Sequence, residues 1–475
     1  MPITGQLLPG VKDPVIPAYN VANSLRFNSG SSDYLNRTAT SGNQRTFTFS
    51  CWFKLCDTAT QYLGSQSSGS NSYMAIYIQS SEVRVYDQNN SNQTLYFRTN
   101  RLLRDFSAWY HLMVAVDTTQ STESNRVKIY INGVQETSFA SSTYPSQNTD
   151  TNINHNGTVF QIGRYDYTGI GSPTHYLNSY LAETVLVDGS QLDQTSFGEF
   201  DSDSPNIWKP IDVSGLTFGT NGFYLDFEDS SSLGNDAAGS NNFTVNNLTA
   251  TDQSTDTCTN NFATMNALDN QIQGATFSEG NLQVVTGASG YYSPTLSTIG
   301  VSQGKWYCEI ELDTIGGSGS AVGVLAKQVT GQAIIGDDAN GVAYLLYDGQ
   351  KRTGGTSSSF GNTLANGDVV GIALDLDNNK VYFSKNGTFQ ASGDPAGNSN
   401  GISVTAPAST DTGFYFIGVQ DVGNGSPGTT YKLNFGSPPY SISSGNADAN
   451  GFGNFEYAVP SGYFAHCTKN LAEFG

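Results

Sequence analysis

"RTFTFSCWFKL", residues 45–55, alternates so regularly that it indicates a β-strand with two different faces. One set of alternate positions holds Phe47, Phe49, Cys51, Phe53 and Leu55, and the other holds Thr46, Thr48, Ser50, Trp52 and Lys54. Successive side chains of a strand point to opposite sides of its sheet. The pattern therefore predicts a strand with the first set on one face and the second set on the other.

Similar short runs continue along the chain and favour an all-β protein. Aromatic residues make up 12% of the sequence, and 52 glycines, together with Ser, Thr and Asn, separate the runs. Aromatic and β-branched runs between such turn-formers are typical of β-sandwiches. The 475 residues exceed what a single core holds. We therefore expect two antiparallel β-sandwich domains, and no stretch has the length and apolarity of a transmembrane helix.

The composition also narrows the range of partners and compartments. The chain has a formal net charge of −20, so nucleic acids and anionic membrane surfaces, which attract basic proteins, are not expected as partners. The N-terminus lacks the basic and apolar regions of a signal peptide, which predicts synthesis in a cytoplasm without export. The five cysteines show no metal-binding spacing, and we expect buried thiols rather than a disulfide framework.

Five motifs follow one another between residues 21 and 200. They are "TFTFSCWFKL", "WYHLMVAVD", "VKIYINGV", "FQIGR" and "LAETVLVDGSQL". Their order resembles that of the laminin-G-like, concanavalin A-like jelly roll, which implies a two-sheet sandwich over this region. By this resemblance Trp109 and His111 are signatures of the fold. We expect His111 to be a hydrogen-bonded core histidine and not a ligand.

The two segments that flank this first domain look different from it. Residues 201–275 hold one strong strand pattern, "GFYLDFED", among turn-forming residues, and are predicted to be a connecting segment. The segment resembles one that follows laminin-G-like domains in tail and fibre proteins of bacteriophages. Residues 1–20 carry prolines spaced as in an extended arm. Such an arm is either a disordered leader or a peg that docks on other virion proteins.

A second set of motifs lies between residues 276 and 437. It comprises "GKWYCEIELD", "AVGVLA", "YDGQK", "GDVVGIALD" and "FSKNG". These motifs resemble, in order, those of the SPRY domain. The resemblance implies a second, curved two-sheet sandwich that binds partners through loops at one rim and has no catalytic activity. Residues 438–475 are left as a C-terminal extension.

Three acids in the first of these motifs raise the question of catalysis. Glu309, Glu311 and Asp313 stand at every second position and so share one face of a strand. A retaining glycosidase needs two carboxyl groups about 5 to 5.5 Å apart, but the water-facing side of a half-buried strand explains the same pattern. No catalytic motif is present elsewhere, and the four histidines are scattered. We therefore expect a binding protein with no catalytic residues.

Two acidic stretches leave a calcium site open without identifying its ligands. Asp375 and Asp377 lie in "LDLDNNKVYFSKNG", where oxygen ligands suit Ca²⁺, but a β-turn at Asp377-Asn378-Asn379 explains the residues without a metal and is preferred. The stretch "YLDFEDSSSLGND" is similar, and laminin-G-like relatives often hold Ca²⁺ at a rim. No metal-binding residue is assigned.

Ligand-binding residues are expected in the loops, where sandwich proteins carry recognition. The first candidate is "GRYDYTGIGSPTHYLNS", residues 163–179, because aromatic rings can stack on sugar faces while polar side chains hold hydroxyls. Its candidate residues are Tyr165, Asp166, Tyr167, His175 and Tyr176. The second candidate, "YDGQKRTGGTSSSFG", residues 347–361, exposes Lys351 and Arg352.

These features together favour a surface protein of a bacteriophage virion. The preferred hypothesis is a host-attachment adhesin, a tail or head fibre, that binds cell-surface glycan through its loops and docks through residues 1–20. A homo-oligomer is expected, although no heptad pattern supports one. A structural decoration protein and a polysaccharide-degrading enzyme are the alternatives.

Overall fold

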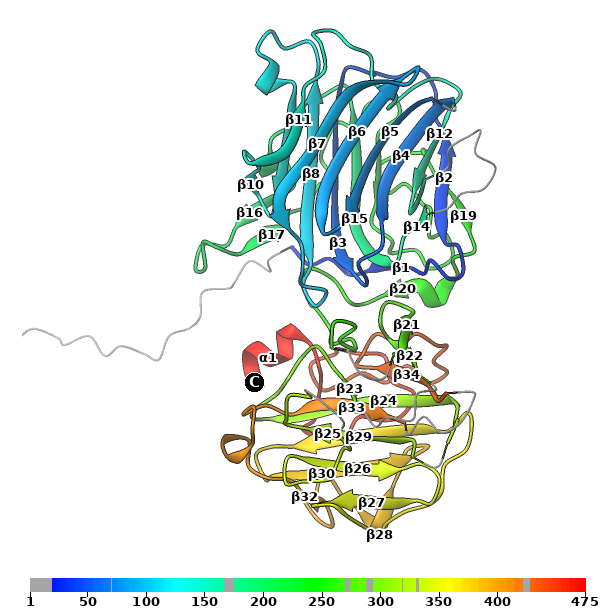
Figure 1. Ribbon diagram of the computed structural model, residues 1–475, viewed down its shortest axis with the longest axis vertical. Coiled ribbons are helices and arrows are strands. Elements are labelled where there is room, and N and C mark those ends of the chain that lie inside the picture. The colour runs from blue at the N-terminus through cyan, green and yellow to red at the C-terminus, as the bar shows by residue number, and fades with distance from the viewer. Residues whose placement is uncertain are drawn as a thin grey trace, which may run out of the picture.

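The computed structural model describes most of the chain as two β-domains arranged along the long axis of the molecule (Figure 1). The described residues are 19–69, 71–165, 175–269, 274–287, 294–317, 319–329, 333–421 and 428–475. Of the expected N-terminal arm, only Tyr19 and Asn20 belong to this part. The fold class is confirmed, because the described chain forms antiparallel sheets in two sandwiches.

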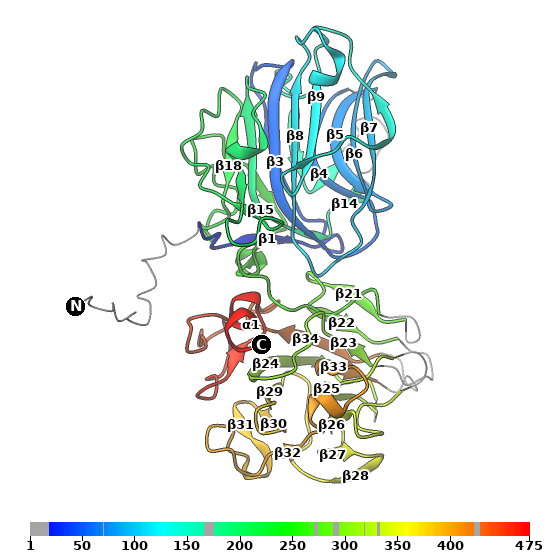
Figure 2. The ribbon, with the colours of Figure 1, turned by 90° about the vertical axis from the view of Figure 1, so that its left-hand side faces the viewer.

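The first domain packs two sheets face to face, which Figure 2 shows from the side. The sheet nearer the viewer in Figure 1, here the front sheet, has the order β11 (Phe139–Thr143), β7 (Asn92–Leu102), β6 (Glu82–Asn89), β5 (Ser72–Gln79), β4 (Gln61–Gly69), β12 (Val159–Ile162), β2 (Tyr34–Thr38) and β19 (Thr244–Asn246). The back sheet has the order β10 (Val134–Gln135), β9 (Val127–Ile131), β8 (Tyr110–Asp117), β3 (Thr46–Leu55), β15 (Ser179–Asp188), β1 (Ser24–Phe27) and β20 (Gln253–Ser254), with β18 (Phe223–Leu225) beside β15.

The predicted division of β3 into two faces is confirmed, and the phenylalanine face points inward. Phe47, Phe49 and Phe53 are at most 1% exposed and belong to one buried cluster with front-sheet residues such as Val85 and Phe97. Fully burying a large apolar side chain contributes about 1.5 to 3 kcal/mol. The aromatic positions of this one strand therefore supply a large part of what holds the two sheets together.

Two hairpins form where the sequence places turn residues. Ser80 and Ser81 join β5 to β6 with positive φ angles of 55° and 63°, and Asn132 and Gly133 join β9 to β10 with φ of 49° and 74°. Two successive residues with positive φ give the tight turn whose twist matches that of the paired strands.

The other face of β3 is buried as well. Trp52 is 4% exposed and Lys54 is 1% exposed. A later part of the chain covers this face: Trp208 packs in one cluster with Trp52, and Val213 packs against the neighbouring strands β8 and β15. The back sheet thus has apolar neighbours on both of its faces.

Residues 201–275 contribute to the first domain more than the single strand that their sequence predicts. They supply β18, β19 and β20, which pair with β15, β2 and β1 of the sandwich. They also supply β17 (Trp208–Pro210), which pairs with β16 (Gly198–Phe200). The predicted strand "GFYLDFED" is β18.

The second domain is also a pair of antiparallel sheets. One has the order β23 (Thr295–Leu296), β33 (Phe416–Gln420), β25 (Ala321–Leu325), β26 (Gly341–Leu345), β27 (Gln350–Thr353) and β28 (Thr356–Ser359). The other has the order β21 (Thr276–Ser278), β22 (Gln283–Val285), β34 (Thr430–Asn434), β24 (Lys305–Thr314), β29 (Val369–Asp375), β30 (Lys380–Lys385) and β31 (Thr388–Phe389), with β32 (Ile402–Ser403) beside β30 and β35 (Phe464–Ala465) beside β24.

The C-terminal extension lies on the outer face of the sheet that contains β24. Phe455 and Tyr463 of the extension pack with Tyr307 and Tyr382, and the ring centroids of Tyr307 and Phe455 are 5.2 Å apart. The chain then ends in the short helix α1 (Thr468–Phe474), with Phe474 stacked on Phe464 of β35. The extension is therefore an integral part of the second sandwich.

Buried polar contacts join the two domains where they meet. Lys54 of β3 forms an ion pair of 2.8 Å with Asp256, and both side chains are 1% exposed. Tyr180 donates a hydrogen bond to the carbonyl of Gly280, and Asn281 donates one to the carbonyl of Cys56. Strands of the first domain thus contact both the connecting segment and the start of the second sandwich.

Two further observations concern the cysteines and the helical content. All five cysteines are free thiols, and only Cys258 is not fully buried. Within the part of the chain that the structure describes, no helix is long and apolar enough to cross a membrane.

Candidate functional site

The first predicted loop ends in a short hairpin that lies against the front sheet. β13 (Arg164–Tyr165) pairs with β14 (His175–Tyr176), while Asp166 and Tyr167 fall outside the described residues. Tyr165 stacks on Tyr62 of β4, with ring centroids 4.9 Å apart and an interplanar angle of 14°. The edge of His175 meets the same Tyr62 ring at 5.7 Å.

Tyr165 is one member of a continuous group of tyrosines on the outer face of the front sheet. Tyr62 stacks on Tyr77 at 5.0 Å and 17°, and Tyr165 also contacts Tyr73 at 5.0 Å. From Tyr73 the contacts continue to Tyr86 at 5.4 Å and then to Tyr96 at 5.5 Å. We call this group the tyrosine platform; it consists of Tyr62, Tyr73, Tyr77, Tyr86, Tyr96 and Tyr165.

Strand register brings five of these tyrosines together from four neighbouring strands, and β13 adds Tyr165. Tyr62 of β4 lies directly opposite Tyr77 of β5, and Tyr86 of β6 lies opposite Tyr96 of β7. Directly opposed side chains on one face have Cβ atoms only about 4.5 to 5.5 Å apart. Of the six tyrosines, the sequence analysis predicted only Tyr165. Their alternate spacing in "SYMAIYIQ" shows that Tyr73 and Tyr77 share one face, but it does not show which strands lie beside them.

The chemistry of the tyrosine platform suits an amphipathic ligand. All six rings are partly exposed, and each combines an apolar face with a polar hydroxyl group. Burial raises the pKa of Tyr62, Tyr77 and Tyr86 above the ordinary value, so these phenols stay neutral and can donate hydrogen bonds. Flat rings with hydroxyls at their edges can stack on the C–H faces of sugar rings while binding their hydroxyl groups.

A polar hollow of about 290 Å³ lies next to the hairpin. The sides of the hollow come from β2, β4, β12 and β13, and they include Asn36, Ser67, Gln161 and Arg164. Arg164 lies over the ring of Tyr34, 3.8 Å from its centroid, and it donates a hydrogen bond of 2.7 Å to Gln161. The predicted residue Tyr176 lies beside the same Tyr34 ring, at 6.1 Å.

The second predicted loop is a hairpin of the second domain and is not brought to the tyrosine platform. Lys351 and Arg352 lie in β27, which pairs with β28 toward the far end of the second domain (Figure 1). Arg352 forms an ion pair with Asp337 and donates a hydrogen bond to Ser357. The two predicted sets of ligand-binding residues therefore form two separate surfaces.

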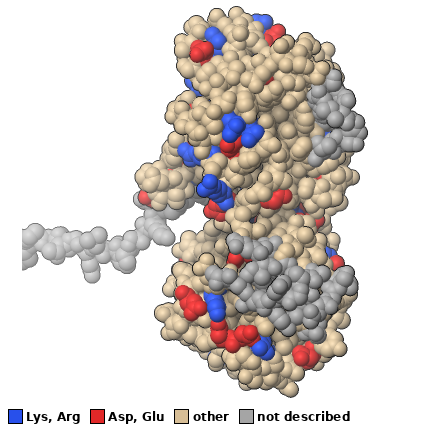
Figure 3. Space-filling model, viewed as in Figure 1, with Lys and Arg blue, Asp and Glu red and all other residues tan. Residues whose placement is uncertain are grey.

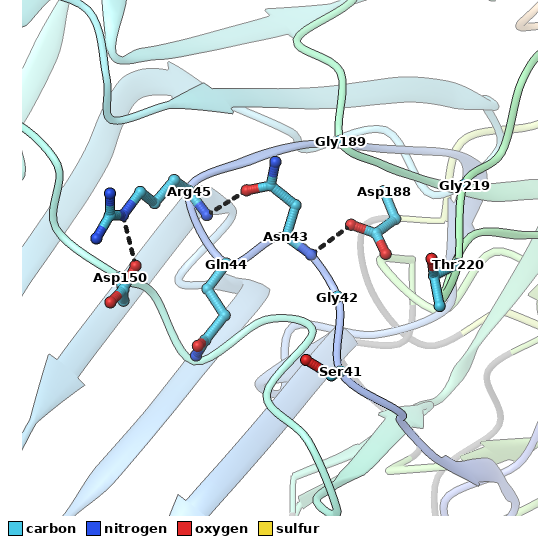
Figure 4. A pocket seen from close by; sticks show the side chains of 10 residues that line it. All are labelled: Ser41, Gly42, Asn43, Gln44, Arg45, Asp150, Asp188, Gly189, Gly219 and Thr220. Atoms are coloured by element: carbon cyan, nitrogen blue, oxygen red, sulfur yellow. Dashed lines mark hydrogen bonds and ion pairs between the residues drawn. The ribbon is translucent and has the colours of Figure 1, made fainter.

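A wider hollow, of about 570 Å³, opens at one end of the first sandwich (Figure 4). Arg45 points across it toward Asp150, with which it forms an ion pair, and both side chains are about half exposed. Asp188 accepts hydrogen bonds from the backbone N–H groups of Asn43 and Asn221 and therefore orders the loops around the hollow. The residues that line it include no aromatic ring.

The three alternating acids of β24, here called the acid row, are Glu309, Glu311 and Asp313. One of their carboxylates is buried, and the other two form ion pairs. Glu309 is 0% exposed, so the prediction of a water-facing row was wrong for this residue. Its oxygens accept hydrogen bonds from the backbone N–H groups of Glu456 and Tyr457 in the extension. Lys432 forms ion pairs with both Glu311 and Asp313. The row thus anchors the extension and a neighbouring strand.

The acidic stretches that were considered as a possible Ca²⁺ site form hydrogen bonds within the protein. Asp375 accepts hydrogen bonds from the backbone and side-chain amides of Asn378, which is the expected turn, and Asp236 accepts them from the backbone of Tyr224 and Asn241. Among the described residues, no group of three or more His, Cys, Asp and Glu side chains is arranged to hold a metal ion. The Ca²⁺ hypothesis stays a prediction.

His111 is the buried, hydrogen-bonded histidine that the sequence predicts. Trp208 donates to its Nδ1 at 3.1 Å, which leaves Nε2 as the protonated nitrogen facing the hydroxyl of Ser50 at 2.8 Å. Burial lowers the pKa of His111 to about 3, so the ring is neutral at physiological pH. His111 thus binds Trp208, which belongs to the segment that covers the back sheet, and it is not part of the tyrosine platform.

Comparison with known families agrees with this architecture. Residues 29–188 match the model of the concanavalin A-like lectin/glucanases superfamily, and residues 305–395 match that of the SPRY domain. The chain carries a concanavalin A-like domain followed by a SPRY domain. The β3 to β15 sandwich with its tyrosine platform is the concanavalin A-like domain, and the sandwich around β24 and β29 is the SPRY domain.

Individual relatives are distant and cover only parts of the chain. A 140-residue stretch, 29% of this chain, is 28% identical to E3 ubiquitin-protein ligase RKP of Arabidopsis thaliana, and it spans only 10% of that protein's length. A SAP-like pentraxin of Limulus polyphemus is 17% identical over 37% of this chain and 80% of its own, with a TM-score of 0.28. A putative carbohydrate binding protein of Bacteroides ovatus is 16% identical over 48% and 59%, with a TM-score of 0.33. The SPRY domain of human HERC1 is 18% identical over 32% and 87%, with a TM-score of 0.24.

Proposed function

We propose that this protein is a non-enzymatic host-attachment protein on the surface of a bacteriophage virion and binds cell-surface glycan through the tyrosine platform. The observation that carries glycan binding is the continuous group of partly exposed tyrosine rings in contact with one another, next to a hollow lined by amides, hydroxyls and Arg164. A concanavalin A-like fold is consistent with such a role.

The particle context rests on the sequence of the flanking segments. Residues 201–275 resemble a segment of phage tail and fibre proteins, and residues 1–20 are proposed to dock on other virion proteins, in a homo-oligomer. Deleting residues 2–20 should leave a folded protein that no longer enters particles. Incorporation of the truncated chain at the normal level would refute the docking role.

The binding role can be tested with the full chain on an array of bacterial surface polysaccharides. We expect saturable binding to some of them, weakened at least about tenfold in Tyr62→Ala combined with Tyr86→Ala, because each lost stacking ring removes on the order of 1 kcal/mol or more. Phe414→Ala, an exposed aromatic residue of the SPRY domain, is the matched control and should bind normally.

The alternatives give different results in the same experiment. Absence of binding to any polysaccharide, or unchanged binding by the tyrosine variant, would contradict the proposal and favour a structural decoration protein. Release of oligosaccharides from a bound polysaccharide would show an enzyme. In that case Glu309→Gln would test whether the buried carboxylate of Glu309 takes part.

A further inference from the structure

One cross-strand row of the front sheet changes from aromatic to basic. Tyr62 lies opposite Tyr77, which in turn lies opposite Arg84. Arg84 then lies opposite Arg98 on β7. Because neighbouring strands are about 4.8 Å apart, this row extends for about 14 Å. A chain of sugar rings that follows the row from the tyrosines would reach two guanidinium groups.

The two arginines share a single carboxylate. Arg84 and Arg98 each approach Glu82 at 2.9 Å. Although burial raises the pKa of Glu82, hydrogen bonds from Arg98 and Arg84 outweigh it and lower that pKa, so Glu82 is ionised at neutral pH. One positive charge therefore stays uncompensated. The side chain of Arg98 is 37% exposed and can meet a ligand.

The excess positive charge is confined to this pair of arginines, in a chain whose net charge is −20. The other two arginines of the described front-sheet strands do not add to it, because Arg101 is ion-paired with Glu136 and Arg37 donates hydrogen bonds to the side chains of Asn221 and Asn241. Asp87 is fully buried and accepts hydrogen bonds from Asn152, so it does not offset the surface charge. Figure 3 shows Lys and Arg side chains near the middle of this face of the first domain.

We infer that the glycan recognised by the tyrosine platform is an acidic polysaccharide of the uronic-acid type, whose carboxylates bind to Arg84 and Arg98. A guanidinium group presents parallel N–H donors that match a planar carboxylate, and such charge-assisted bonds are stronger than neutral ones. Ring stacking at the tyrosine end of the row and carboxylate binding at the arginine end fit a polymer of sugar rings that carry acids along the chain. This inference rests on the proposed function and adds the chemical class of its ligand.

The test compares the full chain on three probes: alginate, which is a polymer of uronic acids, carboxyl-reduced alginate and dextran sulfate. We expect tightest binding to alginate, weakening as salt is added because the partly exposed charges are screened. Arg84→Gln combined with Arg98→Gln should weaken alginate binding at least about tenfold and leave binding to the reduced polymer unchanged. Lys327→Gln removes one charge from an exposed ion pair of the SPRY domain and should have no effect.

The outcomes separate this inference from the proposed function. Equal binding to alginate and its reduced form, or unchanged alginate binding by the arginine variant, would overturn the acidic-glycan inference while the tyrosine variant still tests glycan binding. Preference for dextran sulfate over alginate would also overturn it, since the anion would then be a sulfate. A folded arginine variant, checked by its thermal unfolding, is required for either conclusion.

Discussion

Glu183 has a positive φ of 47° at a bulge of β15, a conformation that non-glycine residues rarely adopt. Its carboxylate is 6% exposed and accepts hydrogen bonds from the hydroxyls of Tyr19, at 3.1 Å, and Tyr224, at 2.8 Å. Such backbone strain persists only where the surroundings hold it. Here the surroundings include Tyr19, so this contact fixes the point where the chain leaves the N-terminal arm and enters the first domain.

The ionisation of Glu183 predicts a pH dependence of stability. Burial raises its pKa from the ordinary 4.5 to about 7, although Tyr224 and Tyr19 oppose the shift. A raised pKa means that the stabilising contribution is complete below pH 4.5 and is lost as the pH rises through 7, by roughly 3 kcal/mol in total. Glu183→Gln should therefore flatten the change in the free energy of unfolding between pH 4.5 and 8, measured by urea denaturation. An identical slope in the variant would show that Glu183 does not titrate in this range.

At the scale of elements, the C-terminal extension completes the SPRY sandwich. Phe455 is fully buried, and the neighbouring backbone N–H groups of the extension satisfy Glu309. Phe455→Ala should lower the free energy of unfolding by about 3 to 5 kcal/mol, because it leaves a cavity between the extension and Tyr307. The exposed Phe414→Ala is the control and should change it by less than about 0.5 kcal/mol. A stable Phe455→Ala protein would mean that the extension only rests on the sheet.

Elements also show which features can be predicted from sequence. Alternation in β3 grouped Phe47 and Phe49 on one face, because that information lies within one strand. It did not show that Trp52 on the other face is buried as well, and the alternation in β24 placed Glu309 on a water-facing side. The segments that cover these two residues lie far away in the chain. Predicting the tyrosine platform would also require the pairing register of the strands, because tyrosines on four front-sheet strands become neighbours only through that register. The predicted loop therefore contained one residue of the platform, Tyr165, but the other five tyrosines were not predicted.

At the scale of the whole molecule, the two domains are joined by buried polar groups. Besides its ion pair with Asp256, Lys54 donates hydrogen bonds to the Asn261 side chain and the Phe262 carbonyl, and Trp109 donates to Asp256 at 3.0 Å. Removing one member of a buried ion pair leaves the other charge uncompensated, at a cost of about 3 to 5 kcal/mol. The residues around the Lys54–Asp256 pair connect the core of the first domain with the core of the second. Loss of the ion pair should therefore weaken the coupling of the domains as well as their stability.

The wild-type protein should consequently unfold in a single calorimetric transition, and Lys54→Ala should separate this into two, with the concanavalin A-like domain losing stability first. Combining Lys54→Met with Asp256→Asn removes both charges and keeps an acceptor for Trp109, so most of the lost coupling should return. If Lys54→Ala still melts in one transition at the wild-type temperature, the ion pair does not couple the sandwiches. If the double variant is as unstable as the single one, the effect comes from lost packing around Lys54 and not from the unpaired charge on Asp256.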